Sequence, residues 1–527
     1  MPHRRLRLFL WGWLLILFGG ALAYAVQAGS GVRMQTLGAD MLYLPPGAST
    51  AHRLPGVVIV PDGRASVGGL GWELARHGYV ALVQGADGDG LARLRALAMV
   101  DAGAIGLLGI GVGGAAVLRA AEATPDGYRA VVLLGAGLER GGLGPDFPRN
   151  IAVIYGDSDE FARRAWGVAR ASEMTRSPVL ARLFGIRAEA APGRVYGTVA
   201  DGRGRMLLMP AMTHAFAGFS RAAVAGSVAW FMRCLPGGLP VDPFNQIWLW
   251  PQLGGGIALA GVLTMLLGGF ELLLTLPGFE MLDGLPDSAA ARRTMTWWTG
   301  WGLASWVPVL GYFAFLDLGA VYLPAGAVFQ QPVTNQILGW LALSAGLNLA
   351  LTLALRGDQA DAYGSPLLAL ASALVMAAAG YGVVAALAAV GVTPAVLGLG
   401  LRALDGREWG QMLAYLPGFT LSLVLILHNL HARLSVYDDD PITHYLSNIG
   451  AVCAGMAVFL AVQYGWLFAT GHVLSPDQPE AVVLATRLLP LQVVLAVVAT
   501  FTWRRTGNVL PGAFMCGGLA TWFLVGL

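Results

Sequence analysis

The stretch I-G-L-L-G-I-G-V-G-G-A-A-V-L-R-A-A, residues 105–121, indicates how the first half of the chain folds. Its first six residues are apolar or glycine, which is typical of a fully buried strand. The glycine-rich turn at 109–114 ends that strand, and the apolar spacing after it predicts a helix. A buried strand that leads through a tight turn into a helix is the repeating unit of a parallel sheet covered by helices.

The same alternation continues on both sides of this stretch. Further strands are predicted at 57–60, 78–83, 131–135, 151–156 and 206–210, and helices at 71–77, near 90–100 and at 220–234. We therefore expect residues 31–240 to form one α/β domain with a mostly parallel sheet and helices on both faces.

Composition separates this domain from the rest of the chain. Of the 527 residues, 56% are hydrophobic and only 12% are charged, whereas an ordinary soluble domain carries about 25% charged residues. Most of the charged residues fall between 31 and 240. We infer that lipid surrounds much of the remaining chain, as a membrane anchor at 1–30 and a transmembrane bundle at 241–527.

The anchor is predicted from a basic start, R-R-L-R-L at 4–8, followed by an apolar run of about 20 residues, which is long enough to cross a bilayer. An uncleaved signal anchor is the favoured interpretation. A signal peptide cleaved at A-L-A, residues 21–23, is the alternative, and both would export the following domain.

Apolar runs predict about eight helices in the bundle. We place them near 247–275, 295–317, 335–355, 366–391, 411–431, 445–469, 480–503 and 507–526.

Arginines then give the orientation, because cytoplasmic loops are enriched in basic residues. Alternate loops contain Arg292, Arg293, Arg356, Arg433, Arg504 and Arg505, whereas the loops 318–334 and 470–480 contain none. This distribution predicts a plasma (inner) membrane protein with a cytoplasmic amino terminus and an extracytoplasmic α/β domain. Only 392–410, with Arg402 and Arg407, departs from the rule, and we expect it to be re-entrant or interfacial.

Several function classes are excluded. A net charge of +2 with scattered basic residues predicts no nucleic-acid partner. The chain contains no lysine, which excludes a phosphate-loop lysine, a Schiff base and a Ser–Lys dyad. Its three cysteines are far apart, so we expect no metal site, and no motif calls for a cofactor.

Three motifs in the α/β domain carry a resemblance to a known family. They are G-I-G-V-G-G at 109–114, Y-G-D-S-D at 155–159 and M-T-H-A at 212–215. In this order, each at the end of a predicted strand, they resemble the α/β-hydrolase superfamily, nearest to its dienelactone-hydrolase-like and esterase branches. The resemblance implies a nucleophile at position 111, an acid at Asp159, a base at His214, and an oxyanion-hole loop at Asp62–Gly63.

The nucleophile position departs from the family pattern, because it holds Gly111. Glycine cannot attack a carbonyl, and no serine or cysteine lies between 104 and 122. The elbow turn is strained in active members, and glycine relieves such strain. We interpret the domain as a catalytically degenerate hydrolase, with Ser66 and Ser158 as the nearest alternative hydroxyls in the sequence.

The remaining site residues have two interpretations. Asp159 and His214 either form a structural hydrogen bond, or they polarise a water molecule or bind a ligand at the strand ends. The Gly111 and Val112 amides begin a helix and would suit an anion such as a phosphate or carboxylate headgroup. Together with Asp62 and Gly63, they are the predicted ligand-binding residues.

Three ionisable residues of the bundle are functional candidates, because charges at membrane depth are costly. Glu271 lies near the inner end of the first bundle helix, Arg487 in the outer half of the eighth crossing, and Asp317 at the outer surface. A Glu271–Arg487 ion pair is one possibility, although the two depths differ. Tryptophans at the ends of apolar runs, among them Trp248 and Trp297, are interpreted as an interfacial belt.

Three functions compete. The first is a membrane protein whose α/β domain binds a ligand or a protein partner and acts on the bundle. The second is a membrane-bound ester or lipid hydrolase with a non-standard nucleophile or a water activated by His214 and Asp159. The third is a transporter-like bundle with an accessory domain. Membrane lipid is an expected partner throughout, and a small ester, a lipid or an anion is an expected ligand.

Overall fold

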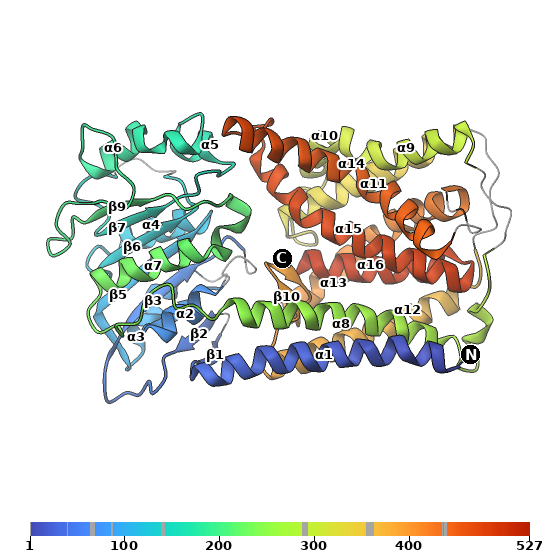
Figure 1. Ribbon diagram of the computed structural model, residues 1–527, viewed down its shortest axis with the longest axis horizontal. Coiled ribbons are helices and arrows are strands. Elements are labelled where there is room, and N and C mark those ends of the chain that lie inside the picture. Colours follow the sequence, from blue (N-terminus) through green and yellow to red (C-terminus); the bar gives the residue numbers. More distant parts are fainter. Residues whose placement is uncertain are drawn as a thin grey trace.

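The computed structural model describes residues 2–38, 40–63, 69–85, 88–138, 143–286, 293–354, 363–434, 436 and 440–526. Figure 1 shows two bodies side by side. The strands and the helices between them form the α/β domain, which runs from β1 to α7. The helix α1 and the helices from α8 onward form the helical bundle. Arg292 and Arg356, which the orientation argument used, lie outside the described residues.

Among the described residues of the α/β domain, nine strands form one sheet in the order β1-β2-β4-β3-β5-β6-β7-β9-β8. The strands are β1 (Arg33–Leu37), β2 (Asp40–Leu44), β3 (Leu54–Val60), β4 (Val80–Val83), β5 (Val100–Ile110), β6 (Ala130–Leu134), β7 (Ile151–Ile154), β8 (Val195–Tyr196) and β9 (Arg205–Leu208). Pairing is parallel from β4 through β9, and antiparallel where β1, β2 and β8 join the edges. The mostly parallel sheet is confirmed; the β1–β2 hairpin and β8 are additions to the expected strands.

Helices cover both faces of this sheet, as expected. Neighbouring strand residues alternate between two cores: Val58 packs with the α3 and α4 side, whereas Val57 and Ile59 pack with the α2 and α7 side. The helices are α2 (Leu70–Arg76), α3 (Gly90–Ala96), α4 (Gly113–Ala123), α5 (Ala162–Trp166), α6 (Pro178–Phe184) and α7 (Arg221–Cys234), with short 3₁₀ turns η2 (Ala171–Arg176) and η3 (His214–Phe219). Burial on both faces explains the continuous apolar runs of the strands.

In the bundle, a helix lies at each of the eight expected places. They are α8 (Leu249–Leu273), α9 (Met295–Leu310) with α10 (Tyr312–Tyr322), α11 (Pro332–Ala354), α12 (Pro366–Ala389), α13 (Gly406–Asn429), α14 (Pro441–Thr470), α15 (Pro479–Thr506) and α16 (Val509–Val525), and the anchor is α1 (Pro2–Ser30). A short 3₁₀ turn (Glu280–Leu282) follows α8, and a π-turn (Leu430–Leu434) extends α13. Among the described residues, α1, α8, α12, α13, α14 and α15 are each long and apolar enough to cross a membrane.

One expected helix is broken. The segment predicted at 295–317 bends by 59° between α9 and α10. Pro308 lies inside α9 near this break, and its carbonyl oxygen accepts from the Trp340 indole at 2.8 Å. Counted as one span, this pair would be a seventh crossing.

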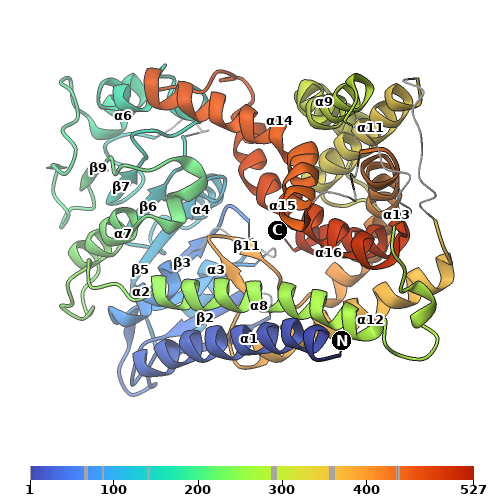
Figure 2. The ribbon, with the colours of Figure 1, turned by 45° about the vertical axis from the view of Figure 1, so that its right-hand side comes forward.

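Helices α1 and α8 lie side by side along their whole length (Figures 1 and 2). Glycines allow the approach: a Cβ on Gly12 would meet the backbone of Met265 at 2.4 Å, and one on Gly268 would meet the backbone of Phe9 at 2.3 Å. Small residues at such crossings let two membrane helices pack closely. Helix α1 therefore packs as part of the helical bundle.

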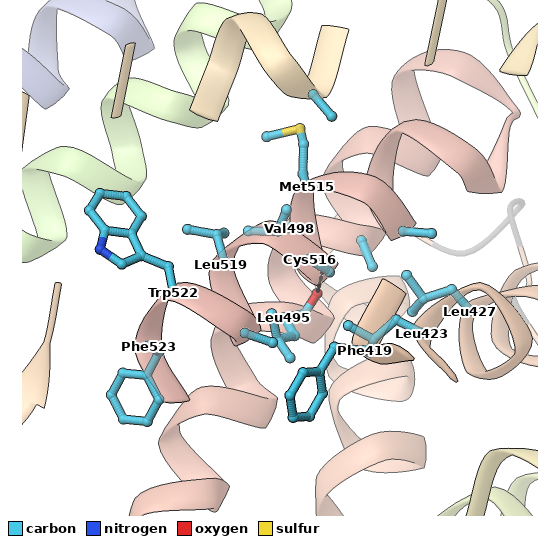
Figure 3. Close-up of a cluster of buried hydrophobic side chains, with 14 of the residues drawn as sticks. Phe419, Leu423, Leu427, Leu495, Val498, Met515, Cys516, Leu519, Trp522 and Phe523 are labelled. Atoms are coloured by element: carbon cyan, nitrogen blue, oxygen red, sulfur yellow. Dashed lines mark hydrogen bonds between the residues drawn. The ribbon is translucent and has the colours of Figure 1, made fainter. Parts of the chain in front are cut away.

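Figure 3 shows the apolar contact between α13, α15 and α16. Ten of its side chains are Phe419, Leu423, Leu427, Leu495, Val498, Met515, Cys516, Leu519, Trp522 and Phe523. The Cys516 thiol donates to the Leu495 carbonyl oxygen at 3.4 Å, which satisfies its weak donor within this core.

The segment that departs from the basic-residue rule is held by its own ion pair. Arg402 binds the Glu408 carboxylate through two guanidinium nitrogens and donates to the Gly526 carbonyl oxygen at 2.9 Å. Its charge is thus neutralised at the carboxyl end of α16. A two-stranded hairpin, β10 (Ala395–Val396) and β11 (Leu399–Gly400), occupies the rest of this segment.

Two tryptophans differ from the interfacial interpretation. Trp248 is 2% exposed and packs in the core of the α/β domain, where it fills the space beside Gly69. Trp297 is 5% exposed, and its indole donates to the Leu434 carbonyl oxygen. Both are buried packing residues, because tertiary contacts cover positions that the sequence places at the ends of apolar runs.

Candidate functional site

Asp159 and His214, the predicted acid and base, lie close together in the structure. Asp159 follows β7, His214 begins η3, and His214 Nδ1 lies 3.2 Å from Asp159 Oδ2. The other Asp159 oxygen accepts from the Tyr155 hydroxyl at 2.8 Å and from the Phe161 amide at 2.9 Å. Asp159 is 1% exposed, so these bonds hold both the carboxylate and the imidazole in place.

On its other side, His214 faces a second carboxylate. Asp62 follows β3, and its Oδ2 lies 3.6 Å from His214 Nε2. Its Oδ1 accepts from the Val112 amide at 3.4 Å. The Gly111 amide donates to the Leu134 carbonyl oxygen at 3.0 Å. Both helix-start amides that were predicted to bind an anion are therefore engaged, one by the sheet and one by the protein's own carboxylate.

Asp62 also occupies the space beside the nucleophile position. Gly111 has a φ of +51°, and a Cβ built there would lie 2.7 Å from Asp62 Oδ2. The site thus consists of an imidazole between two carboxylates, with no hydroxyl at position 111. Ser158, one alternative hydroxyl, donates to Asp157 Oδ1, and Ser66, the other, lies outside the described residues.

A third carboxylate, that of Glu160, binds the backbone of the segment that carries His214. Glu160 accepts from the His214 backbone amide at 2.7 Å and from the Tyr464 hydroxyl of α14 at 2.6 Å. It is 4% exposed. Because one carboxylate binds both the histidine loop and a bundle helix, Glu160 couples the position of the site to the bundle.

These charges set the protonation of the site. Burial lowers the pKa of His214, but the Asp159 charge and hydrogen bond, together with Asp62 and Glu160, outweigh it and raise that pKa to about 10. Burial and the Asp159 charge raise the pKa of Glu160 to about 7. At neutral pH, His214 is therefore an imidazolium.

Helix α15 of the bundle packs against this site. Val483 and Arg487 of α15 line a cavity of about 20 Å³ together with Asp62 and His214, and the Arg487 charge interacts with Asp62. A cavity of this volume has room for about one water molecule. Arg487 thus balances the negative charge of Asp62 in the α/β domain. The sequence of α15 alone does not indicate this partner.

A larger groove lies next to this cavity. It has a volume of about 720 Å³ and is lined by the η3 region of the α/β domain and by α14 and α15. Its lining includes Asp157, Ser158, Ala211, Met212, Thr213, Phe216, Phe219, Ser220, Leu460, Tyr464, Phe468, Thr486, Leu489 and Pro490.

The other predicted residues lie elsewhere. Glu271 binds Arg505 near the carboxyl end of α8, and not Arg487, because the turn of α15 that carries Arg487 faces the α/β domain. Asp317 accepts from Gln478 at 3.1 Å in the loop before α15. Gly63 adopts a φ of +94° in the turn after Asp62.

Sequence reasoning missed Glu160, Tyr464 and Glu73. The side chain of Glu73, buried in α2, accepts from the Ile247 and Trp248 amides at the start of α8 and so ties the α/β domain to the bundle. A glutamate inside the apolar stretch 70–75 and a second acid directly after Asp159 are the signals that point to Glu73 and Glu160. Tyr464 gives no comparable signal.

Solved structures match about two fifths of this chain. Esterase 2 from Thermogutta terrifontis matches with 12% identity and a TM-score of 0.27, over 39% of this chain and 96% of that one. Dienelactone hydrolase from Anabaena variabilis matches with 15% identity and a TM-score of 0.26, over 39% and 99%. A protein described as a dipeptidyl aminopeptidase IV, from Bacteroides ovatus, matches with 16% identity and a TM-score of 0.27, over 38% of this chain and only 35% of its own length.

No family model matches the sequence, and no curated protein matches it. With TM-scores of this size, the likenesses carry no argument about activity. The description of the domain as α/β-hydrolase-like rests on its sheet order and on the strand ends that carry Asp62, Gly111, Asp159 and His214.

Proposed function

We propose that this chain is a non-catalytic membrane protein whose α/β domain uses a degenerate hydrolase site to dock onto the bundle and to bind a ligand or partner at that junction. In this proposal, residues 1–30 anchor the chain, 31–240 form the docked domain and 241–527 form the transmembrane bundle. The observation that carries it is the small cavity in which Arg487 of α15 meets Asp62 and His214.

Two further features support the absence of catalysis. A serine-type mechanism needs a nucleophile and an unprotonated histidine that takes its proton. Gly111 supplies no nucleophile, and the pKa of His214, raised to about 10 by its carboxylate neighbours, keeps the imidazole protonated at neutral pH. The cavity that His214 lines has a volume of only about 20 Å³, which is less than an acyl group occupies.

We further propose that the domain lies outside the cytoplasm at the plasma (inner) membrane. The support is the arginine distribution in the sequence and the position of the domain at the carboxyl end of α1, opposite the amino terminus (Figure 1). The described cysteines are all buried, so the wild-type chain should react little with a maleimide. They are Cys234, Cys453 and Cys516. A single Asp126→Cys variant should react with a membrane-impermeant maleimide in intact cells; protection until lysis would reverse the orientation.

The activity test uses the purified full-length protein in detergent. Wild type should hydrolyse no p-nitrophenyl ester and should resist a fluorophosphonate probe, as should the His214→Ala variant. Ester hydrolysis by wild type that His214→Ala abolishes would overturn the non-catalytic proposal.

The runner-up function is a membrane-bound ester or lipid hydrolase. The intact Asp159–His214 hydrogen bond favours it, because that pair orients the imidazole in active members of the fold. It requires α15 to move away from the site and a nucleophile other than residue 111. The same assay, with His214→Ala as its control, decides between the two.

A further inference from the structure

The groove beside the degenerate site has two walls of different chemistry. One wall belongs to the α/β domain and includes Ser158, Thr213 and Phe216. The other belongs to α14 and α15, two helices long and apolar enough to cross a membrane, and includes Leu460 and Leu489. At about 720 Å³, the groove is within the range of sites for small molecules, about 300–1,000 Å³.

Its apolar wall continues onto the outer surface of the bundle. Phe468 lines the groove and is 66% exposed, and Phe216 on the facing wall is 45% exposed. Trp466 on the same helix is 43% exposed, as expected for a ring at a membrane interface. An apolar surface that runs from a membrane-crossing helix into a groove is continuous with the hydrocarbon of the bilayer, so lipid can enter without passing through water.

The polar end of the groove lies at the α/β domain. Asp157, Ser158 and Ser220 supply one carboxylate and two hydroxyls there, whereas Leu460, Phe468 and Leu489 lie on the helices. A ligand that satisfies both ends has a long hydrocarbon chain and a polar head that offers hydrogen-bond acceptors to the hydroxyls and a positive charge to the carboxylate.

We infer that this groove binds one acyl chain of a bilayer phospholipid, with the headgroup region at Ser158 and Ser220 and the chain against α14 and α15. The inference rests on the proposed function, since it names the ligand that the docked, non-catalytic domain binds. It also gives the junction a role: the lipid contacts the same loop, 211–220, that carries His214, while Glu160 links that loop to Tyr464.

The test uses the full-length protein in nanodiscs of phosphatidylcholine that contain a small fraction of phosphatidylcholine with a diazirine in one acyl chain. After irradiation, mass spectrometry locates the label. Lipids that merely surround the bundle contact outward-facing residues of its helices, so label on the 211–220 peptide of the α/β domain identifies the groove. We expect that peptide to be labelled together with a peptide of α14 or α15.

A matched pair of variants tests the site itself. Ala211→Trp places a ring inside the groove, whereas Ala461→Trp places the same ring on an exposed position of α14 that is not part of the groove lining. The first should lower labelling of 211–220 about tenfold, the size of effect that a small steric misfit has in an apolar pocket; the second should leave it unchanged. Thr486→Trp, from the opposite wall, provides a second filling variant if Ala211→Trp does not fold.

The outcomes separate the two proposals. Absence of label from 211–220 in wild type, or equal labelling in the filled variants, overturns the lipid site and leaves the non-catalytic proposal standing. Release of a labelled fatty acid from the lipid during incubation shows hydrolysis and overturns the non-catalytic proposal. Label in the groove with the lipid intact supports both.

Discussion

The Asp62 carboxylate occupies the space that a side chain at position 111 would need. A Cβ on Gly111 would lie 2.7 Å from both Cγ and Oδ2 of Asp62, far closer than van der Waals contact allows. The same carboxylate accepts from the Val112 amide and faces His214 Nε2. The absence of a side chain at position 111 and the position of Asp62 therefore depend on each other. The Asp62 carboxylate occupies the place where the family has its nucleophile.

This relationship predicts that Gly111→Ser alone restores no ester hydrolysis. The new side chain would collide with Asp62 and should lower the free energy of unfolding by about 1–3 kcal/mol, the usual cost of overpacking. In the double variant Gly111→Ser with Asp62→Ala, the clash is removed, so the two changes should couple favourably by about 0.5–3 kcal/mol. Thermal unfolding of the four proteins measures the coupling, and strict additivity would contradict the contact.

Removal of the Arg487 charge should loosen the junction. In Arg487→Met, the partly buried Asp62 loses a countercharge, which should weaken docking by about 1–3 kcal/mol. Hydrogen exchange of the 211–219 backbone should then become faster. Arg407→Met is the matched control, because Arg407 donates to the exposed Gln330 and lines neither cavity; equal effects of the two variants would refute a specific role for Arg487.

The burial of Glu160 where it contacts Tyr464 should make the junction sensitive to pH. The folded pKa of Glu160 is raised from 4.5 to about 7 by burial and by Asp159. The folded state therefore favours the protonated acid, so this contribution to stability is full below about pH 4.5 and is lost as the pH rises through about 7.

The protection factors of the amides at 157–161, which compare their exchange rates with the intrinsic rates at each pH, should consequently fall between about pH 5 and pH 8. Glu160→Gln keeps a hydrogen-bonding side chain without the charge and should flatten this dependence. Tyr464→Phe should loosen the junction while the pH dependence from burial persists. A pH profile in Glu160→Gln that matches wild type would assign the effect to another group.

The stabilising contribution of His214 should be lost in a separate pH range, on the alkaline side of neutrality. Its folded pKa is raised from 6.5 to about 10, so its stabilising contribution is full below about pH 6.5 and is lost as the pH rises through about 10. The Tm of wild type should fall between about pH 7 and pH 10, and that of His214→Gln should fall less over the same interval. An unchanged slope in the variant would mean that the imidazole is not held charged by Asp159 and Asp62.

The sequence predicted the strands, turns and helices that follow from short-range patterns of apolar residues and glycine. The stretch 105–121 indicated the strand β5, the turn at Gly111 and the helix α4, because burial on both faces of a parallel sheet requires an unbroken apolar run. The helix positions of the bundle followed in the same way from apolar length. Asp159 and His214 were paired because their motifs resemble those of the α/β-hydrolase superfamily, and the carboxyl ends of the parallel strands do bring the two side chains together.

Only the tertiary structure decided what surrounds those residues. Arg487 and Glu271 are both charges in apolar helices, and nothing local shows that the first faces Asp62 while the second binds Arg505. Such partners are set by how segments far apart in the sequence pack together, and helix periodicity does not record the direction of that packing. The same holds for the groove, whose two walls come from 157–220 and 460–490 and exist as a site only when the α/β domain lies on the bundle.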